Sequence, residues 1–189
     1  MPKIIRNIEE NIFNAAFELF GEHGYKETDM KKIAKRAGIA VGTLYNYYSN
    51  KRELFVSVFV KSWNNTFLRI DNMINQKINA QEKIKSFIEI LYDEISERKG
   101  LGEELSKENA FNREDGEKMS FVKEELSNRI QGLLNEFRND GELKLESDMD
   151  ERLGFSLIVL IANMIRSYSE EKDKNLKFIN QLIESIYKK

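Results

Sequence analysis

A chain of 189 residues, 41% of them hydrophobic and 33% charged, predicts a folded protein rather than a disordered one. The lack of cysteine excludes disulfides, thiolate metal sites and cysteine nucleophiles, and the single histidine, His23, argues against imidazole-rich metal sites and histidine-based catalysis. No secretion signal is recognisable, and the longest uncharged apolar run, about a dozen residues around 155–165, is too short to span a bilayer. We therefore expect a cytoplasmic protein that contacts no membrane and needs no cofactor.

Basic residues are concentrated in one N-terminal stretch, although the whole chain has a net charge of −2. The segment 30–52 contains no acidic residue and holds Lys31, Lys32, Lys35, Arg36, Lys51 and Arg52. A local basic stretch of this kind can attract DNA phosphates even when the molecule is acidic overall. A lysine-rich helix face that meets only solvent would show the same charge.

Apolar residues recur at helical spacing along almost the whole chain, which is the pattern of helices packed by one face. We expect an all-α fold with about nine helices. The first helix is predicted to end at Gly21 and Gly24, because glycine tolerates the left-handed conformation beyond a helix end. Short helices are predicted at 30–36 and 41–48.

The longer second part of the chain is helical by the same criterion. Helices are expected at 51–76, 79–97, 116–139, from Asp148 or Asp150 to Tyr168, and from Asp173 to Tyr187, with the aspartates as helix caps. The stretch 99–114, which contains glycines and many polar residues, is the least certain. Alternating strand patterns and internal repeats are absent from the sequence.

The two short helices have the features of a helix-turn-helix. Such a motif needs a small residue on its first helix so that the second can cross closely, a residue that accepts positive φ in the turn, and an apolar anchor on the second helix. Ala34, Gly38 and Leu44 meet these needs in order. The spacing also arises by chance in helical proteins, but here it coincides with the basic stretch and with the polar and aromatic side chains of 43–47.

This part of the sequence resembles the DNA-binding domain of the TetR family of bacterial transcription regulators. The resemblance covers residues 12–55 without a gap and rests on the first helix at 12–20, Gly24-Tyr25, Ile33-Ala34, Ala37-Gly38-Ile39, Gly42-Thr43-Leu44-Tyr45, Tyr48 and the segment 50–54. It implies a DNA-binding domain at 1–50 and a helical ligand-binding and dimerisation domain at 51–189. It also implies a homodimer in which a small ligand changes the spacing of the two DNA-binding heads.

The family pattern implies which residues meet DNA, with the helix 41–48 in the major groove. Thr43 and Asn46 would reach base edges, and Gly42 would let the helix approach the DNA backbone closely. Phosphate contacts are expected from Thr28, Tyr45, Tyr47 and Lys51.

Two positions depart from the family pattern. Ala40 stands where a capping Ser or Thr is common, and Val41 where a polar or basic residue is common. Val41 could pack on a thymine methyl group, which would suit an A·T-rich operator. Other assignments have a structural alternative: Tyr48 is expected in the core, Thr28 could be only a helix cap, and Tyr45 could be an ordinary surface aromatic.

The two C-terminal helices are too apolar for ordinary surface helices, since 153–168 carries apolar residues on nearly all sides. They resemble the dimerising pair of the family, which forms a four-helix bundle across a two-fold axis. The dimer interface is expected to contain Phe155, Ile158, Ile161, Ile165, Phe178, Leu182 and Ile186. A dimer would place two recognition helices about 34–36 Å apart and would require a near-palindromic operator. A monomer with one buried central helix is the alternative.

Aromatic residues and methionines of the body could line an apolar ligand pocket. The candidates are Trp63, Phe67, Phe87, Tyr92, Phe111, Met119, Phe121 and Met164, although at helical spacing such residues are more often plain core. Asn163 and Arg166 are the polar candidates, because on so apolar a helix they would need partners if they pointed inward.

We predict a ligand-responsive transcriptional regulator, a repressor, that binds operator DNA as a homodimer and is released by a small apolar or amphipathic effector. The alternative from another class is a small helical enzyme or a helical small-molecule-binding protein without DNA binding. No paired catalytic carboxylates, nucleophile elbow, phosphate loop or metal-ligand spacing supports an enzyme. The third candidate, an architectural DNA-binding protein without a ligand, fits poorly with the long aromatic-rich body.

Overall fold

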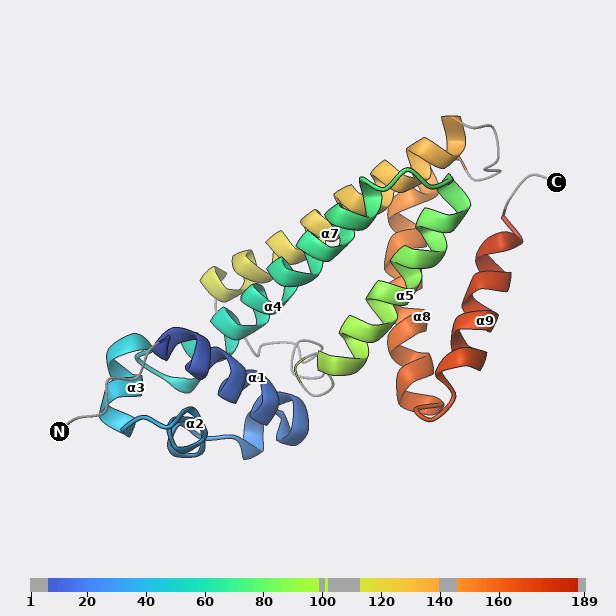
Figure 1. The fold of residues 1–189 in the computed structure, drawn as a ribbon. Coiled ribbons are helices and arrows are strands. Elements are labelled where there is room, and N and C mark those ends of the chain that lie inside the picture. The colour runs from blue at the N-terminus through green and yellow to red at the C-terminus, as the bar shows by residue number, and fades with distance from the viewer. Residues whose placement is uncertain (1–6, 99–100, 102–112, 140–145, 187–189) are drawn as a thin grey trace. The chain divides into compact units, whose positions relative to one another are not determined.

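The computed structural model describes residues 7–98, 101, 113–139 and 146–186, which contain helices and no strand (Figure 1). The predicted all-α class is confirmed. The described residues hold eight α-helices, namely α1 (Ile8–Glu27), α2 (Met30–Ala37), α3 (Val41–Tyr47), α4 (Lys51–Ile74), α5 (Ala80–Arg98), α7 (Arg113–Asn139), α8 (Asp150–Ser167) and α9 (Lys172–Glu184). A short 3-10 helix, η2 (Ser147–Met149), precedes α8.

The chain divides into two compact units. The first unit consists of Met1–Trp63 and Glu97–Met119, and the second of Asn64–Ser96 and Ser120–Lys189. Helices α4, α5 and α7 contribute residues to both units. Of the stretch 99–114, the least certain by sequence, only Leu101 and the first residues of α7 are described, and Leu101 is buried.

A side-chain cap explains where α2 begins. The Asp29 carboxylate accepts a hydrogen bond from the backbone N–H of Lys32 at 2.8 Å, so Asp29 rather than Thr28 is the cap. This backbone hydrogen bond lowers the pKa of Asp29 below its ordinary value. The cap residue is extended, with φ −131°, and α2 follows directly.

Reciprocal capping boxes fix the starts of α4 and α5. The Asn50 side chain accepts from the N–H of Glu53 at 2.9 Å, and the Glu53 carboxylate accepts from the N–H of Ser49 at 2.9 Å and from its hydroxyl at 2.6 Å. At α5, Asn79 accepts from the N–H of Glu82 at 2.8 Å, and Glu82 accepts from the N–H of Asn79 at 3.4 Å. The predicted cap at Ser49-Asn50 is confirmed.

Other predicted helix ends are wrong. Gly21 lies inside α1, where a Cβ would come within 3.6 Å of a backbone carbonyl of α5, so this glycine allows close packing. Gly24, with φ +73°, breaks the helical geometry, but α1 resumes and continues to its last residue, Glu27. The predicted aspartate caps of α8 and α9 make no capping bond, and the Asp150 carboxylate instead pairs with Arg138 at 2.7 Å.

The core of the first unit joins α1, α2, α3 and the start of α4. Ile33 and Leu44 are fully buried. The rings of Phe20 and Tyr25 each meet the Phe55 ring edge-on, with ring centroids 5.1 Å apart in both pairs. This aromatic cluster attaches the C-terminal part of α1 to α4.

The second unit packs helices of both halves of the sequence. Arg129 of α7 donates to both carboxylate oxygens of Asp71 on α4 at 2.8 Å, and its guanidinium lies 4.4 Å from the centre of the Phe67 ring. The hydrogen bonds that Arg129 donates to Asp71 raise the pKa of Arg129. Gly154 of α8 faces Ile130 of α7, where a Cβ would be 3.0 Å from the isoleucine side chain, so α8 and α7 cross closely. Within the described ranges, every helix is too short or too polar to cross a bilayer.

Candidate DNA interface and helical body

The connection between α2 and α3 has the geometry of a helix-turn-helix. Gly38 closes α2 with φ +71° and ψ 27°, a left-handed conformation that glycine adopts without strain. The N–H of Ile39 donates to the Ala34 carbonyl oxygen at 3.0 Å and completes the helix end. Ala34 and Leu44 are fully buried, so the small residue and the apolar anchor pack as their spacing predicted.

Helix α3 presents side chains to solvent. Its exposed residues are Gly42, Tyr45, Asn46 and Tyr47, and its half-buried ones are Val41 and Thr43. Tyr45 and Tyr47 are 50% and 40% exposed. A Cβ on Gly42 would meet nothing within 4 Å, so packing inside the protein does not require glycine at this position. Large aromatic side chains exposed beside polar ones indicate a surface for a partner.

Thr28 does not lie at this surface. The residue is 1% exposed. The hydroxyl is placed to donate to two carbonyl oxygens, that of Gly24 at 2.8 Å and that of Leu19 at 3.0 Å. A hydroxyl has a single hydrogen, and both acceptors near it are internal. The predicted phosphate contact of the Thr28 side chain is therefore wrong, and the residue instead stabilises the end of α1.

Lys51 is also engaged inside the protein. Its ammonium donates to the carbonyl oxygens of Tyr25 at 2.7 Å, Thr28 at 2.8 Å and Lys26 at 3.5 Å, and lies 4.2 Å from the centre of the Tyr25 ring. An ammonium has three donors, and the C-terminal end of α1 is where a helix dipole favours a cation. Within the single chain Lys51 therefore attaches the start of α4 to the end of α1, and its phosphate contact stays a prediction.

The remaining cations of the basic stretch differ in their engagement. Arg36 pairs with Glu18 at 2.6 Å, and the Lys32 ammonium donates to the Glu27 carbonyl oxygen at 2.7 Å. Lys31 and Lys35 are exposed on α2. Part of the predicted basic surface is therefore used within the first unit.

The predicted dimer residues lie on α8, α9 and just after α9, and most reach the surface. Phe155, Phe178 and Leu182 are 60%, 50% and 47% exposed, and Ile158, Ile165 and Ile186 are half-buried. Ile161 is the exception, because it is fully buried within the protomer and offers nothing to a partner, so its assignment to the interface is wrong. Val159, which was not among the predicted residues, is exposed four residues after Phe155, and this spacing places it on the same face.

The predicted pocket residues are dispersed. Trp63 is buried in the first unit, while Phe67, Phe87 and Tyr92 are buried in the second, and Met164 is half-buried. Phe111 and the side chain of Met119 lie outside the described residues.

Other pocket candidates lie at the surface. Phe121 is 45% exposed, and Asn163 and Arg166 are exposed and bond to each other at 2.7 Å. The prediction that these three line an interior pocket is wrong, because Phe121 of α7 and the two polar residues of α8 all reach the surface.

A polar groove lies between α4 and α5 within the second unit. Its volume is about 470 Å³, and its lining includes Arg69, Asn72, Gln76, Ser86, Glu89 and Asp93. Sequence reasoning missed it because these residues look like the solvated faces of two separate amphipathic helices.

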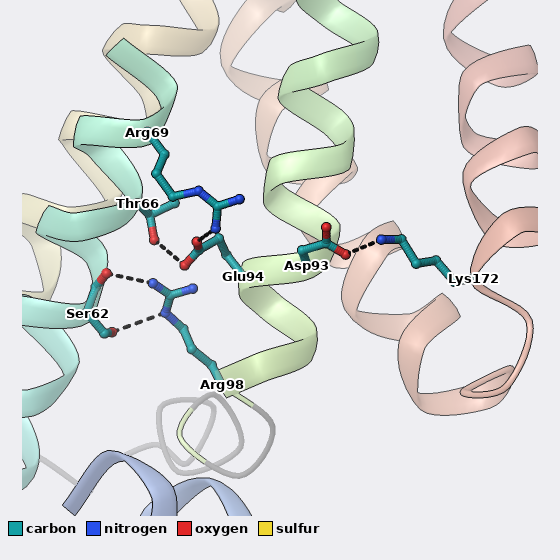
Figure 2. A network of polar contacts seen from close by, with 7 residues as sticks. All are labelled: Ser62, Thr66, Arg69, Asp93, Glu94, Arg98 and Lys172. Atoms are coloured by element: carbon teal, nitrogen blue, oxygen red, sulfur yellow. Dashed lines mark hydrogen bonds and ion pairs between the residues drawn. The ribbon is translucent and has the colours of Figure 1, made fainter. Parts of the chain in front are cut away.

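One turn of α5 carries buried polar contacts, drawn in Figure 2. Glu94 is 8% exposed and accepts a hydrogen bond from the Thr66 hydroxyl at 2.7 Å and another from the Arg69 guanidinium. The neighbouring Asp93 accepts from the Lys172 ammonium at 2.5 Å, and this bond raises the pKa of Lys172. These contacts tie α5 to α4 and to α9.

A second polar contact of α5 lies within the first unit. Arg98 is buried, and its guanidinium donates to the Ser62 hydroxyl at 3.1 Å and to the Ser62 carbonyl oxygen at 2.8 Å (Figure 2). The same guanidinium lies 4.4 Å from the centre of the Trp63 ring. The last turn of α5 is therefore attached to α4.

Comparison with known proteins agrees with this geometry. Residues 12–58 match the family described as bacterial regulatory proteins, tetR family. The fatty acid metabolism regulator protein of Bacillus subtilis is 30% identical over 148 residues, which are 78% of this chain and 75% of that protein. The chain belongs to the TetR family. A further TetR-like relative is the transcriptional activator FasR of Mycolicibacterium smegmatis, 29% identical over 97 residues, which are 51% of this chain and 44% of FasR.

Solved structures share the TetR fold over nearly the whole chain. FadR from Bacillus subtilis in complex with stearoyl-CoA aligns with a TM-score of 0.76 and 24% identity, covering 94% of this chain and 97% of that one. FadR from Bacillus halodurans aligns with a TM-score of 0.75 and 24% identity, covering 92% and 96%. This TetR-family chain is a DNA-binding transcriptional regulator, and its relatives are regulators rather than enzymes.

Proposed function

We propose that this protein is a homodimeric repressor that binds a near-palindromic operator through α3 and is released by a long-chain acyl-CoA. The observation that carries the proposal is the exposed face of α3, held in a complete helix-turn-helix with Gly38 in the turn and Leu44 as the anchor. Residues 1–50 would form the DNA-binding part and residues 51–189 the effector and dimerisation part. A regulator of chromosomal promoters would work in the cytoplasm.

The contacts with DNA follow from the chemistry of α3. Thr43 and Asn46 would read base edges, since an amide can bond bidentately to adenine. The hydroxyls of Tyr45 and Tyr47 would bond to DNA phosphates on either side of the groove that holds α3. Val41 could pack on a thymine methyl group, and Gly42 would let the helix backbone approach the DNA, in line with the open space around it.

The proposed dimer rests on the outward face of α8 and α9. Phe155, Val159, Phe178 and Leu182 all keep about half or more of their surface exposed in the single chain. Large apolar side chains gathered on one face mark a protein interface. Two copies of this face would form the four-helix bundle and set the distance between the two α3 helices.

The proposed effector rests on likeness and on the interior of the second unit. FadR of Bacillus subtilis was solved with stearoyl-CoA, and the 30% identical relative is a fatty acid metabolism regulator. In this chain, Phe67, Phe87 and Tyr92 are each buried in the second unit, and large buried side chains of this kind would line an acyl-chain pocket once the core rearranges.

The experiment measures binding of the purified protein to DNA from its own promoter region by fluorescence anisotropy. Tight binding at physiological salt and release by stearoyl-CoA, but not by CoA or by inert detergent at the same concentration, are expected. Transcription in vitro should fall on adding the protein and recover with stearoyl-CoA. Failure to bind this DNA would refute the operator, an increase in transcription would refute repression, and binding that no acyl-CoA weakens would refute the effector.

A further inference from the structure

We propose that the α5 turn Tyr92-Asp93-Glu94 is the joint that positions α4 relative to the dimer helices, and that both operator spacing and the effector response depend on it. This inference rests on the proposed dimer and effector. The three residues lie on one turn, and their side chains reach two different helices of the second unit. Packing of the apolar face of α5 does not require polar groups at these three positions.

Glu94 makes the contact with α4. Glu94 is buried, and Thr66, whose hydroxyl donates to it at 2.7 Å, is fully buried, while the Arg69 guanidinium bonds to the other carboxylate oxygen (Figure 2). A buried carboxylate is costly unless it is paired and hydrogen-bonded. Two of its partners, Thr66 and Arg69, lie on α4 and therefore favour one position of α5 against α4.

Tyr92 and Asp93 make the contacts with α9. The Asn175 amide donates to the Tyr92 hydroxyl and to the Tyr168 carbonyl oxygen, both at 2.9 Å, and the Lys172 ammonium donates to Asp93 at 2.5 Å. Asn175 is 5% exposed, a buried position where an apolar residue would pack without needing partners. The start of α9 is thus held to the same turn of α5 by directional bonds.

The opposite side of α9 is the proposed dimer face. Ile179 and Ile183 are buried on the side that carries Asn175, whereas Phe178 and Leu182 are exposed. Apolar contacts can slide with little loss, but hydrogen bonds weaken steeply when distance and angle change. A shift of α5 must therefore move α9 and α4 together or break one set of these bonds, which makes the turn a joint with discrete arrangements.

The test uses the full-length protein with the near-isosteric double substitution Tyr92→Phe and Glu94→Gln. Phe keeps the ring in the core, and Gln can still accept from Thr66 but no longer carries the charge that pairs with Arg69. The matched control is Lys85→Gln, which removes an exposed α5–α9 ion pair with Glu184, 2.9 Å long, away from the joint. Helix content by circular dichroism and mass by light scattering check that each variant remains a folded dimer, and the two single substitutions replace the double one if it unfolds.

Two measurements decide the proposal. The first is the spacing preference, which is the affinity for the operator divided by the affinity for operators whose half-sites are moved apart by a few base pairs. We expect this ratio to be about tenfold smaller for the double variant than for the wild type. The second is the ratio of operator affinities without and with stearoyl-CoA, which should shrink by about the same factor. Lys85→Gln should stay within about twofold of wild type in both, as for a surface pair.

The outcomes separate this inference from the proposed function. If the wild-type protein ignores stearoyl-CoA, the proposed effector is wrong, and the spacing measurement alone still decides on the joint. If the folded, dimeric double variant keeps the wild-type spacing preference, the joint is refuted. The same holds if Lys85→Gln changes the spacing preference as much as the double variant, because the effect would then reflect general loosening between α5 and α9.

Discussion

The exposed aromatic side chains of α3 differ in chemistry from those of α8 and α9. On α3 the exposed rings are tyrosines, Tyr45 and Tyr47, on either side of Asn46. On α8 and α9 they are phenylalanines, Phe155 and Phe178, accompanied by aliphatic residues. A tyrosine offers an apolar body with a polar tip, whereas a phenylalanine gains only from leaving water.

This difference indicates two kinds of partner for surfaces of similar exposure. The α3 face suits a polar, charged partner that accepts hydrogen bonds, as DNA does, while the α8–α9 face suits another apolar protein surface. The supporting contacts differ as well, since α3 is anchored in the first unit by the buried, apolar Leu44, whereas α9 is held in the second by the buried hydrogen bond from Asn175 to Tyr92. Substitutions on the α3 face should therefore weaken DNA binding directly, whereas substitutions on the α8–α9 face should first weaken the dimer.

The largest effect is expected from Phe178→Asp on the apolar face. A carboxylate buried against a second copy would prevent the dimer, and operator affinity should fall by about a hundredfold or more because the two heads no longer bind together. Light scattering and anisotropy measure the two effects. Lys177→Asp, at an exposed polar position of the same helix, should leave the mass unchanged, and a Phe178→Asp variant that stays dimeric would show that the interface lies elsewhere.

Lys51→Ala should destabilise the first unit rather than remove a DNA contact. Loss of the charge-assisted bonds to the end of α1 should lower the free energy of unfolding by about 1.5–3 kcal/mol in urea titration. The exposed Lys31→Ala is the control and should change stability by less than about 0.5 kcal/mol. A decrease of about one unit in the salt dependence of DNA binding, without loss of stability, would instead make Lys51 a phosphate contact.

Asn46→Ala tests whether the exposed face of α3 contacts the edges of DNA bases. Removing the amide should cost about 1–3 kcal/mol on the operator and almost nothing on random DNA, because only the operator presents the matching base edge. Thr43→Ala should behave in the same way with a smaller loss. Equal losses on both kinds of DNA in anisotropy titrations would refute the assignment of these residues to base edges.

Tyr45→Phe should give a smaller and uniform effect. The substitution keeps the ring and removes the hydroxyl, so it should weaken operator and random DNA alike by about 0.5–1.5 kcal/mol. Anisotropy titrations of the Tyr45→Phe variant with operator DNA and with random DNA measure the two losses of affinity. An unchanged affinity would make Tyr45 a surface aromatic, and a loss confined to the operator would make it a base reader.

The smallest effect concerns pH. The pKa of Asp29 is lowered by the backbone hydrogen bond from Lys32, so the folded protein holds this proton less tightly than the unfolded chain does. The stabilisation is therefore complete above the ordinary carboxyl pKa and is lost as the pH falls through the lowered value. Asp29→Asn can still cap α2 but does not titrate, so its unfolding curve should depend slightly less on pH under acidic conditions than that of the wild type.

The helix-turn-helix could be predicted from sequence because its requirements are local. Ala34, Gly38 and Leu44 each satisfy a demand set by neighbours a few residues away, and the capping box at Asn50 and Glu53 is visible as a short pattern. Helix positions followed from apolar periodicity for the same reason. The wrong helix end at Gly21 arose because its actual neighbour, the end of α5, is distant in sequence.

Side-chain roles were harder to predict, since they depend on which residue, often distant in sequence, lies beside each side chain in the folded protein. Lys51 and Thr28 carry groups suited to phosphate, but carbonyl oxygens of α1 already occupy them. Ile161 has the same apolar character as its neighbours on α8, and only the packing of the helix shows that it faces inward. Glu94 looks like any charged residue of an amphipathic helix until Thr66 is found beside it.

The open space around Gly42 has a consequence for genetic screens. A methyl group at this position touches nothing in the protein, so libraries sorted only for folding or abundance should accept alanine there freely. Libraries sorted for promoter control should reject it if the DNA backbone comes as close as proposed. Position 42 would then be tolerant in one selection and intolerant in the other, a difference that neither buried nor ordinary surface positions produce.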